Sequence, residues 1–146
     1  MQEVLPKSFN ITSRIRNLML IDFSLEPITQ GELGELNPSI FGFENNVNFS
    51  IEPALKQLTF QYTARIYSNE QLSRKLGEIQ TFAEFELVNM DDFKSDNQIL
   101  LPEELLAMFI GIVLSSTRGM LVVKSAGTHL ENAYIPVMNP MDFFKK

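Results

Sequence analysis

Apolar and polar residues alternate along four segments of the chain, at residues 15–27, 47–52, 58–67 and 79–88. A period of two is typical of strands with one buried face. The buried face is predicted to hold the following residues: Met19, Ile21, Phe23 and Leu25; Val47, Phe49 and Ile51; Leu58, Phe60, Tyr62, Ala64 and Ile66; Ile79, Thr81, Ala83, Phe85 and Leu87. Four consecutive strands followed by a helix predict an α+β fold, with one face of an antiparallel sheet covered.

Residues 101–128 predict one long and strongly apolar helix. Pro102 in the first turn, followed by Glu103 and Glu104 beside the positive end of the helix, marks its start. Residues 105–114 are ten apolar or glycine residues in a row, so the helix needs cover on nearly all sides. One small sheet covers one side only. A second copy of the chain, or a bound apolar ligand, is therefore expected on the other.

The end of this helix and the connecting segments also carry signals. Ser115, Ser116 and Gly119 predict a bend or break before residues 120–125, and Gly127 suits the C-terminal cap. The connections predicted are a flexible arm (residues 1–10), a long irregular loop up to residue 46, a polar hairpin tip (68–77) and a polar linker (89–97). The tail predicts a strand-like stretch at 133–137 and a short helical turn at 141–145, all within a single domain of residues 1–146.

Composition narrows the classes of function. The 146 residues include eighteen acidic and twelve basic side chains, for a formal charge of −6, which argues against nucleic-acid or anionic-membrane binding. Without cysteine, disulfides and thiolate chemistry are excluded. The N-terminus lacks a secretion signal, and no segment is expected to be long enough to insert in a membrane. A cytoplasmic protein is the expectation.

Candidate catalytic residues are few, and each has a simpler explanation. His129 is the only histidine, and a loop residue satisfied by backbone or water explains it. Asp91 and Asp92 suit a solvated turn, and Ser115 and Ser116 lack a nucleophile-elbow pattern. No glycine loop that cradles phosphate is present. We therefore expect no enzyme, metal, cofactor or nucleotide.

Two features point toward binding. Asp22, Glu26, Glu84 and Glu86 would form an acidic patch on the open sheet face if the first and fourth strands are neighbours, although a merely soluble sheet face is the simpler explanation. The second feature is an excess of apolar residues, for which core packing is the alternative; it comprises residues 105–114, Phe82, Val88, Phe143 and Phe144.

Three local strings resemble the SecB family of export chaperones. They are IDFSLEP at residues 21–27, FAEFELVN at 82–89 and SAGTHLENAYIPV at 125–137. The resemblance implies a four-stranded sheet with two helices, assembled as a dimer of dimers whose long helices lie between sheets. It also implies an acidic patch that docks the SecA motor, matched here by Asp22, Glu26 and Glu86. Glu84 stands where the family usually has leucine, and Phe143, Phe144 and two lysines replace the family's acidic tail.

The predicted function is an ATP-independent chaperone that holds unfolded or precursor polypeptides in apolar grooves, with itself and the SecA motor as further partners. The groove is expected between the central helix and the loop at residues 33–43, lined by Phe41, Phe43, Phe82, Met108, Phe109 and Ile112. The alternative is a dedicated partner-binding module, such as a SecB-like adaptor linked to a toxin–antitoxin pair.

Overall fold

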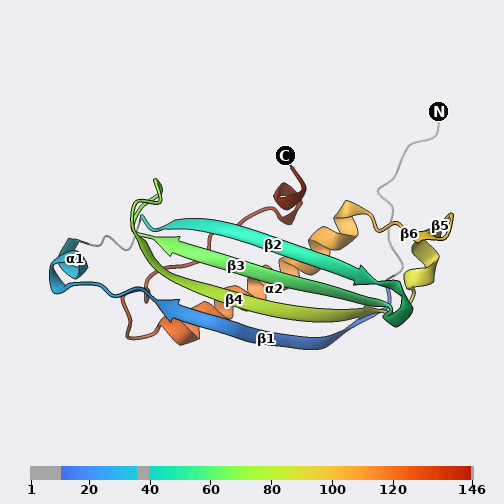
Figure 1. Ribbon diagram of the computed structural model, residues 1–146, viewed down its shortest axis with the longest axis horizontal. Helices are drawn as coiled ribbons and strands as arrows, with labels where there is room; N and C mark the ends of the chain where they lie inside the picture. The colour runs from blue at the N-terminus through green and yellow to red at the C-terminus, as the bar shows by residue number, and fades with distance from the viewer. Residues whose placement is uncertain (1–10, 36–39, 146) are drawn as a thin grey trace.

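The computed structural model describes residues 11–35 and 40–145, which form an α+β fold. One antiparallel sheet has the strand order β1-β4-β3-β2, and helix α2 (Glu103–Ser125) crosses one of its faces (Figure 1). The strands are β1 (Ser13–Leu25), β2 (Gly42–Glu52), β3 (Gln57–Tyr67) and β4 (Lys75–Leu87). This confirms the predicted fold class and the pairing of the first and fourth strands. The predicted arm at residues 1–10 lies outside the described residues.

The connections contain more regular structure than predicted. They hold α1 (Gln30–Glu35), 3₁₀ turns at Pro53–Leu55 and Met90–Phe93, and a small ribbon of β5 (Lys94–Ser95) and β6 (Gln98–Ile99). The irregular loop predicted up to residue 46 was wrong, because β2 begins at Gly42. A Cβ atom at Gly42 would lie 2.0 Å from the Asn69 carbonyl oxygen, so this strand can start against the β3–β4 turn only with glycine.

The core lies between α2 and the central strands β3 and β4. The alternation predicted for both strands is confirmed, since every residue assigned to their inner faces is buried. Phe109 of α2 is fully buried, with its ring centroid 4.7 Å from that of Phe85 and 6.1 Å from that of Phe60. Close packing of large aromatic side chains fixes the helix against the sheet.

In β1, two irregularities overturn the predicted inner face. The register with β4 shifts between Ile15 and Asn17 and again between Leu20 and Asp22. Each bulge adds a residue that reverses the alternation. As a result Leu18 and Leu20 pack against the core, and Met19 pairs with Phe82 on the open face. Phe23, beyond the second bulge, packs against the core as predicted. The predicted inner positions of Met19 and Ile21 were therefore wrong, and both side chains are exposed.

Helix α2 is continuous, so the break predicted at Ser115, Ser116 and Gly119 was wrong. The Ser116 hydroxyl donates to the Ile112 carbonyl at 2.8 Å, and the Thr117 hydroxyl donates to that of Val113 at 2.7 Å. These bonds satisfy the hydroxyls inside the helix, where they do not compete for other backbone conformations. The cap prediction is confirmed, because Gly127 follows the helix in the left-handed region with φ +79°.

By length and composition, α2 is the one helix in the described part of the chain that could cross a membrane, which corrects the prediction that no segment is long enough. In its most apolar 18-residue window, 44% is buried inside the fold. The core helix of a soluble protein passes the same test, so this property alone does not indicate a membrane span.

The C-terminal segment returns along α2 without joining the sheet. The strand predicted at residues 133–137 was wrong, because a side chain takes the carbonyls that a strand would have used. Arg118 of α2 donates to the carbonyl oxygens of Ile135 at 3.0 Å and Pro136 at 2.6 Å. The chain then forms a 3₁₀ turn, Pro140–Phe144, where the short helical turn was predicted, and this turn packs mainly on α2.

A buried hydroxyl pair between helix and sheet gives a first prediction. The Oγ1 atoms of Thr81 and Thr117 lie 2.7 Å apart, and Thr117 already donates to the Val113 carbonyl, so Thr81 is the donor between them. Thr117→Val leaves the Thr81 hydroxyl unpaired and is expected to lower the free energy of unfolding by about 1–3 kcal/mol. Thr81→Val leaves Thr117 bonded to Val113 and is expected to cost less.

Urea unfolding of both single variants and of the double variant measures this difference. The double variant is expected to be more stable than Thr117→Val alone, because no unpaired hydroxyl remains. Equal losses for the two single variants would contradict this donor assignment.

Candidate polypeptide-binding surfaces

The inner face of the edge strand β2 forms an apolar row, which we call the β2 strip: Phe43, Val47, Phe49 and Ile51. Asn45 interrupts the row, but its side-chain oxygen accepts a 2.5 Å hydrogen bond from the Tyr62 hydroxyl. The contacts of α2 with the sheet are mainly to β4, β3 and β1, so the strip lies beside the helix. Phe49 is 42% exposed although it stacks on Phe60 at 5.9 Å. The strip is therefore half-covered, and it runs for roughly 27 Å at strand spacing.

A hollow of about 580 Å³ continues the strip at its Ile51 end. Its apolar lining comes from Ile51, Pro53, Ala54 and Ile99, and its polar lining from Asp91, Lys94, Asn97 and Gln98. Apolar side chains with a few polar groups around them suit an extended peptide segment, whose backbone needs hydrogen-bonding partners. The strip and the hollow together make a continuous candidate surface.

A second apolar surface lies on the side of α2 turned away from the sheet. We call the row Met108, Ile112, Ser115, Gly119 and Val122 the outer stripe. Its spacing of four, three, four and three residues is that of a helix–helix seam. Met108 is 40% and Val122 50% exposed, and a Cβ atom at Gly119 would meet nothing within 4 Å. Nothing within the described part of the protomer requires glycine at this position.

The open face of the sheet carries the predicted acidic residues at the β1–β4 pair. Asp22 lies opposite Gln80, and Glu84 lies between Asn17 and Thr59. Between these two acids, Met19 and Phe82 form a cross-strand apolar pair. We call Met19, Asp22, Phe82 and Glu84 the open-face patch. Among the described residues, neither Asp22 nor Glu84 forms an ion pair.

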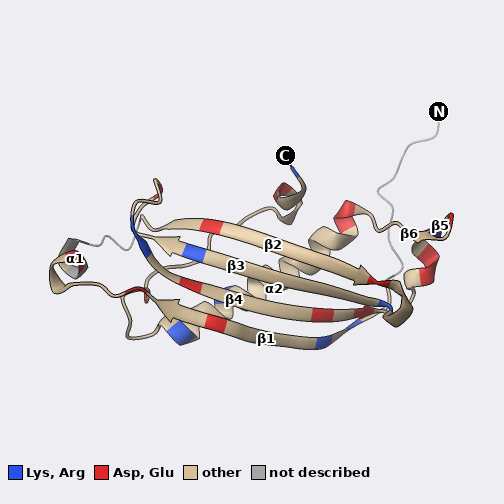
Figure 2. Cartoon of the chain, viewed as in Figure 1, with Lys and Arg blue, Asp and Glu red and all other residues tan. Residues whose placement is uncertain are grey.

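Figure 2 shows basic residues among the acidic ones along the strands of the sheet. Two of them pair with Glu86, so this face is a mosaic and not uniformly acidic. Glu86 pairs with Arg14 at 3.1 Å and with Arg16 at 3.4 Å. Glu26 follows the last residue of β1 and lies 3.8 Å from Lys75. The structure thus brings the four predicted acids to one pair of strands, but it leaves only two of them unpaired.

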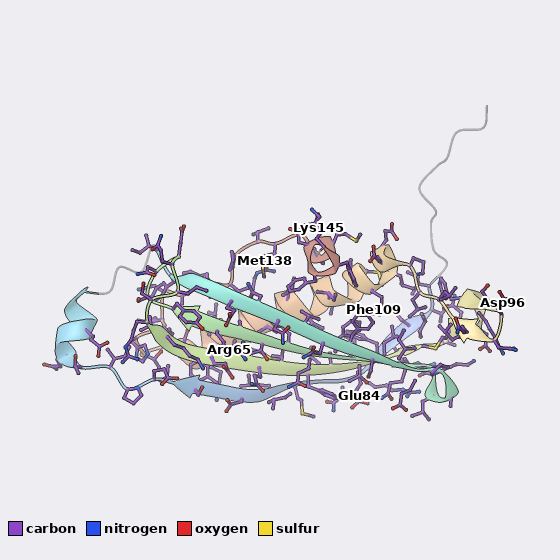
Figure 3. The ribbon with its side chains drawn as sticks, turned by 45° about the horizontal axis from the view of Figure 1, so that its top comes forward. Arg65, Glu84, Asp96, Phe109, Met138 and Lys145 are labelled. Atoms are coloured by element: carbon purple, nitrogen blue, oxygen red, sulfur yellow. The ribbon has the colours of Figure 1, made fainter. Side chains whose placement is uncertain are left out.

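A charge cluster lies where β3 and β4 approach their connecting turn. Arg65, labelled in Figure 3, bridges Glu78 at 3.2 Å and Glu44 at 3.4 Å, and Lys75 contacts Glu78 at 3.0 Å. Burial works to raise the pKa of Glu78, but hydrogen bonds from Lys75 and Gln80, with the positive charges of Lys75 and Arg65, lower it overall. This cluster is internally balanced and offers no free charge to a partner.

Arg74 fastens the β1–β2 connection to the β3–β4 turn. Its guanidinium binds Glu32 of α1 with Nε–Oε2 at 2.8 Å and also donates to the Pro27 carbonyl at 2.7 Å. The hydrogen bond from Arg74, supported by one from the Thr29 amide, lowers the pKa of Glu32 from 4.5 to about 2. The carboxylate stays ionised in mildly acidic solution and keeps this contact.

This contact predicts a pH dependence. Because the pKa of Glu32 is lowered by folding, its contribution to stability is present above pH 4.5 and is lost as the pH falls toward about 2. Glu32→Gln is expected to lower the melting temperature at pH 6 by a few degrees at most, since the pair is exposed, and by much less at pH 2. Glu52→Gln, at an exposed position with no ion pair to another described residue, is the control. An equal loss at both pH values would contradict the assignment.

The catalytic candidates remain separate from one another. His129 places Nε2 2.8 Å from the Leu76 carbonyl oxygen, a backbone contact of the kind expected for a loop residue. Asp91 and Asp92 lie in the 3₁₀ turn Met90–Phe93, and Asp91 is 3.9 Å from Lys56. Within the described ranges, no group of three or more His, Asp or Glu side chains is placed to hold a metal.

The structure does not bring the six predicted client-binding residues together. Phe82 lies on the open face, because its neighbours in β4 alternate with the inner row, and Phe109 is fully buried in the core. Met108 and Ile112 lie on the outer stripe. Only Phe41 and Phe43 lie at the β2 strip, and part of the loop at residues 33–43 falls outside the described residues.

Sequence reasoning missed the part played by Phe49 and Arg118. Phe49 fits the alternation of β2, but its exposure follows from how far α2 extends across the sheet, which the sequence does not state. Arg118 is a basic residue in the middle of an apolar helix, and that position was an available signal for a specific partner.

The described residues form an α+β domain in which one antiparallel sheet is crossed by a long helix and several apolar side chains stay exposed. The fold is similar to that of the Rv1957 SecB-like chaperone of Mycobacterium tuberculosis, in complex with a ChAD peptide from the Rv1956 HigA1 antitoxin. The TM-score is 0.57 at 10% identity, over 86% of this chain and 89% of that one. At this identity the likeness shows a SecB-like fold and nothing finer.

A protein of unknown function from Streptococcus agalactiae also aligns, with 10% identity over 89% of this chain and 99% of that one. Its TM-score of 0.33 is too low to support any argument. No protein-family model matches the sequence, and no curated protein matches it.

Proposed function

We propose that the protein is an ATP-independent chaperone that holds unfolded polypeptides on the β2 strip. The half-covered row of Phe43, Val47, Phe49 and Ile51 carries this proposal, because an edge strand beside a hollow can accept an extended segment. Contacts with such a row depend on apolar area and are tolerant of sequence. The SecB-like fold supports the same function.

Holding can be tested by the aggregation of a chemically denatured protein diluted into buffer, followed by light scattering. Addition of this protein at one to four equivalents is expected to suppress scattering equally with and without ATP. Serum albumin at the same concentration is the control for nonspecific protein. Unchanged scattering at several-fold excess would overturn the proposal.

A dedicated partner-binding role is the second candidate. It is favoured by the structural neighbour, which is in complex with a peptide from an antitoxin. Pull-down with the purified protein distinguishes the two: a chaperone returns many unfolded chains, and a dedicated module returns one partner. Either way we propose a binding function in place of an enzymatic one.

Self-association is part of the proposed function. The outer stripe has the spacing of a helix–helix seam. Packing against the same stripe of a second copy would remove its exposed apolar residues from water. Several strips on one assembly would bind one client with higher avidity. We propose a homo-oligomer, for which a dimer of dimers is the arrangement that the SecB resemblance implies.

The open-face patch is the proposed docking surface for a further protein partner. Its apolar centre, Met19 and Phe82, lies between the unpaired acids Asp22 and Glu84. This suits an apolar segment flanked by basic residues. The SecB resemblance points to a SecA-type motor as that partner, with delivery to export as the outcome.

A further inference from the structure

The C-terminal segment of this chain already occupies part of the β2 strip. The ring of Phe144 contacts that of Phe49 edge-on, with centroids 6.3 Å apart. Phe143 and Met138 are also partly buried against the core. Figure 3 shows Met138 and Lys145 on the side of the sheet where Phe109 and α2 lie. An aromatic residue of the chain itself, Phe144, thus contacts the residue that a client would contact.

The attachment of this segment changes abruptly after Pro136. Up to that residue Arg118 holds the backbone through two hydrogen bonds, to Ile135 and Pro136. Val137, the next residue, is 97% exposed. The backbone is therefore fixed up to Pro136, and the exposed Val137 can act as a hinge for the residues after it.

Beyond the hinge, the polar contacts of the described residues 139–145 are all internal to the segment. The Asn139 side chain accepts from the Met141 amide at 3.0 Å, and Lys145 pairs with Asp142 at 3.0 Å. Only apolar contacts connect the 3₁₀ turn to the rest of the fold. The turn can therefore leave the strip as a unit without exposing an unsatisfied polar group in the core.

We propose that residues 137–145 are an internal ligand of the β2 strip, which clients displace. This inference rests on the proposed chaperone function and deepens it, because the segment shows what the strip binds: a short stretch with two adjacent aromatic residues. A client with such a stretch competes for the same contacts. The segment lowers the apparent affinity for clients by the fraction of time that it occupies the strip.

A reversible lock tests the displacement. A Cβ atom at Gly111 would lie 3.6 Å from Cγ of Pro140, so the two positions are side-chain neighbours. We therefore place the disulfide between them, in Gly111→Cys/Pro140→Cys. The chain has no other cysteine, so only this pair can form a disulfide within the protomer. The oxidised form is expected to bind reduced, carboxymethylated α-lactalbumin at least tenfold more weakly than the same protein after dithiothreitol. Gly111→Cys alone controls for the redox treatment.

A peptide supplied in trans gives an independent measurement. A fluorescent peptide of residues 137–145 is expected to bind the full chain carrying Phe143→Ser and Phe144→Ser, and unfolded α-lactalbumin should displace it. The same peptide with both phenylalanines replaced by serine is the control and should not bind.

Three outcomes bear on the proposal. Tighter client binding by the reduced form, together with displacement of the peptide, supports it. Equal binding by the oxidised and reduced forms overturns the internal ligand while leaving the chaperone function standing. Absence of client binding by the parent chain and by every variant overturns the proposed function, and the internal ligand with it.

Discussion

Phe49→Asp is expected to weaken the binding of unfolded polypeptides by tenfold or more and to remove the suppression of aggregation. Phe49 is the most exposed large side chain of the β2 strip, with 42% of its surface exposed. A client segment laid on this row would have to bury the new carboxylate without a partner. Such burial costs more than the about 1.4 kcal/mol that corresponds to a tenfold change in affinity.

Leu25→Asp is the matched control for this variant. Leu25 has nearly the same exposure, 40%, but belongs to β1 at the opposite edge of the sheet. Circular dichroism should show folded protein for both variants, and fluorescence anisotropy with a labelled unfolded protein measures the affinity. If Phe49→Asp and Leu25→Asp bind the client equally well, the β2 strip is not the client surface.

The strands that the sequence predicted correctly are those with simple surroundings. β3 and β4 lie in the middle of the sheet with α2 on one side, so burial follows the alternation of side chains. β1 lies at an edge, where two bulges were possible, and each bulge reverses the pattern. A period-two pattern carries no information on where a strand gains an extra residue. The inner face of β1 between the two bulges was thus outside the reach of sequence reasoning.

For α2, local propensity gave the wrong prediction and tertiary packing prevailed. Ser115, Ser116 and Gly119 weaken a helix in isolation. In the fold, the flanking residues Val113, Leu114 and Leu121 are buried on the sheet, and the helix continues through the weak positions. Two of these residues, Ser115 and Gly119, lie on the outer stripe, where their small size matters for contact with a partner and not for the end of the helix.

The sequence predicted that apolar binding surfaces exist, but it did not predict where they lie. The sequence showed more apolar residues than one core needs, and the structure does leave apolar residues exposed in the strip and in the stripe. It could not show which of them are core, because Phe109 and Met108 are neighbours in one apolar run of α2, yet Phe109 is buried and Met108 is exposed. Only the direction of each side chain relative to the sheet separates them.

Gly119→Leu is expected to convert the proposed homo-oligomer to protomers while leaving each protomer folded. Space is open at this position within the described part of the protomer, and leucine favours helix over glycine by roughly 0.5–1 kcal/mol, so the helix itself should gain stability. At a seam of facing helices, small residues such as Ser115 and Gly119 permit close approach, and a leucine there would force the helices apart. Analytical ultracentrifugation is expected to show the dissociation constant rising at least a hundredfold.

Lys124→Leu places the same side chain at an exposed position of α2 outside the stripe. It should leave the mass in solution unchanged, because any effect of added apolar surface alone would appear in both variants. Loss of assembly in Gly119→Leu only would identify the stripe as the contact. If Gly119→Leu keeps the parent mass, or if the parent chain is itself a strict protomer at micromolar concentration, the exposed face of α2 is not a seam between copies. The apolar residues of the outer stripe would then be available to a client, which could bind to the stripe as well as to the β2 strip.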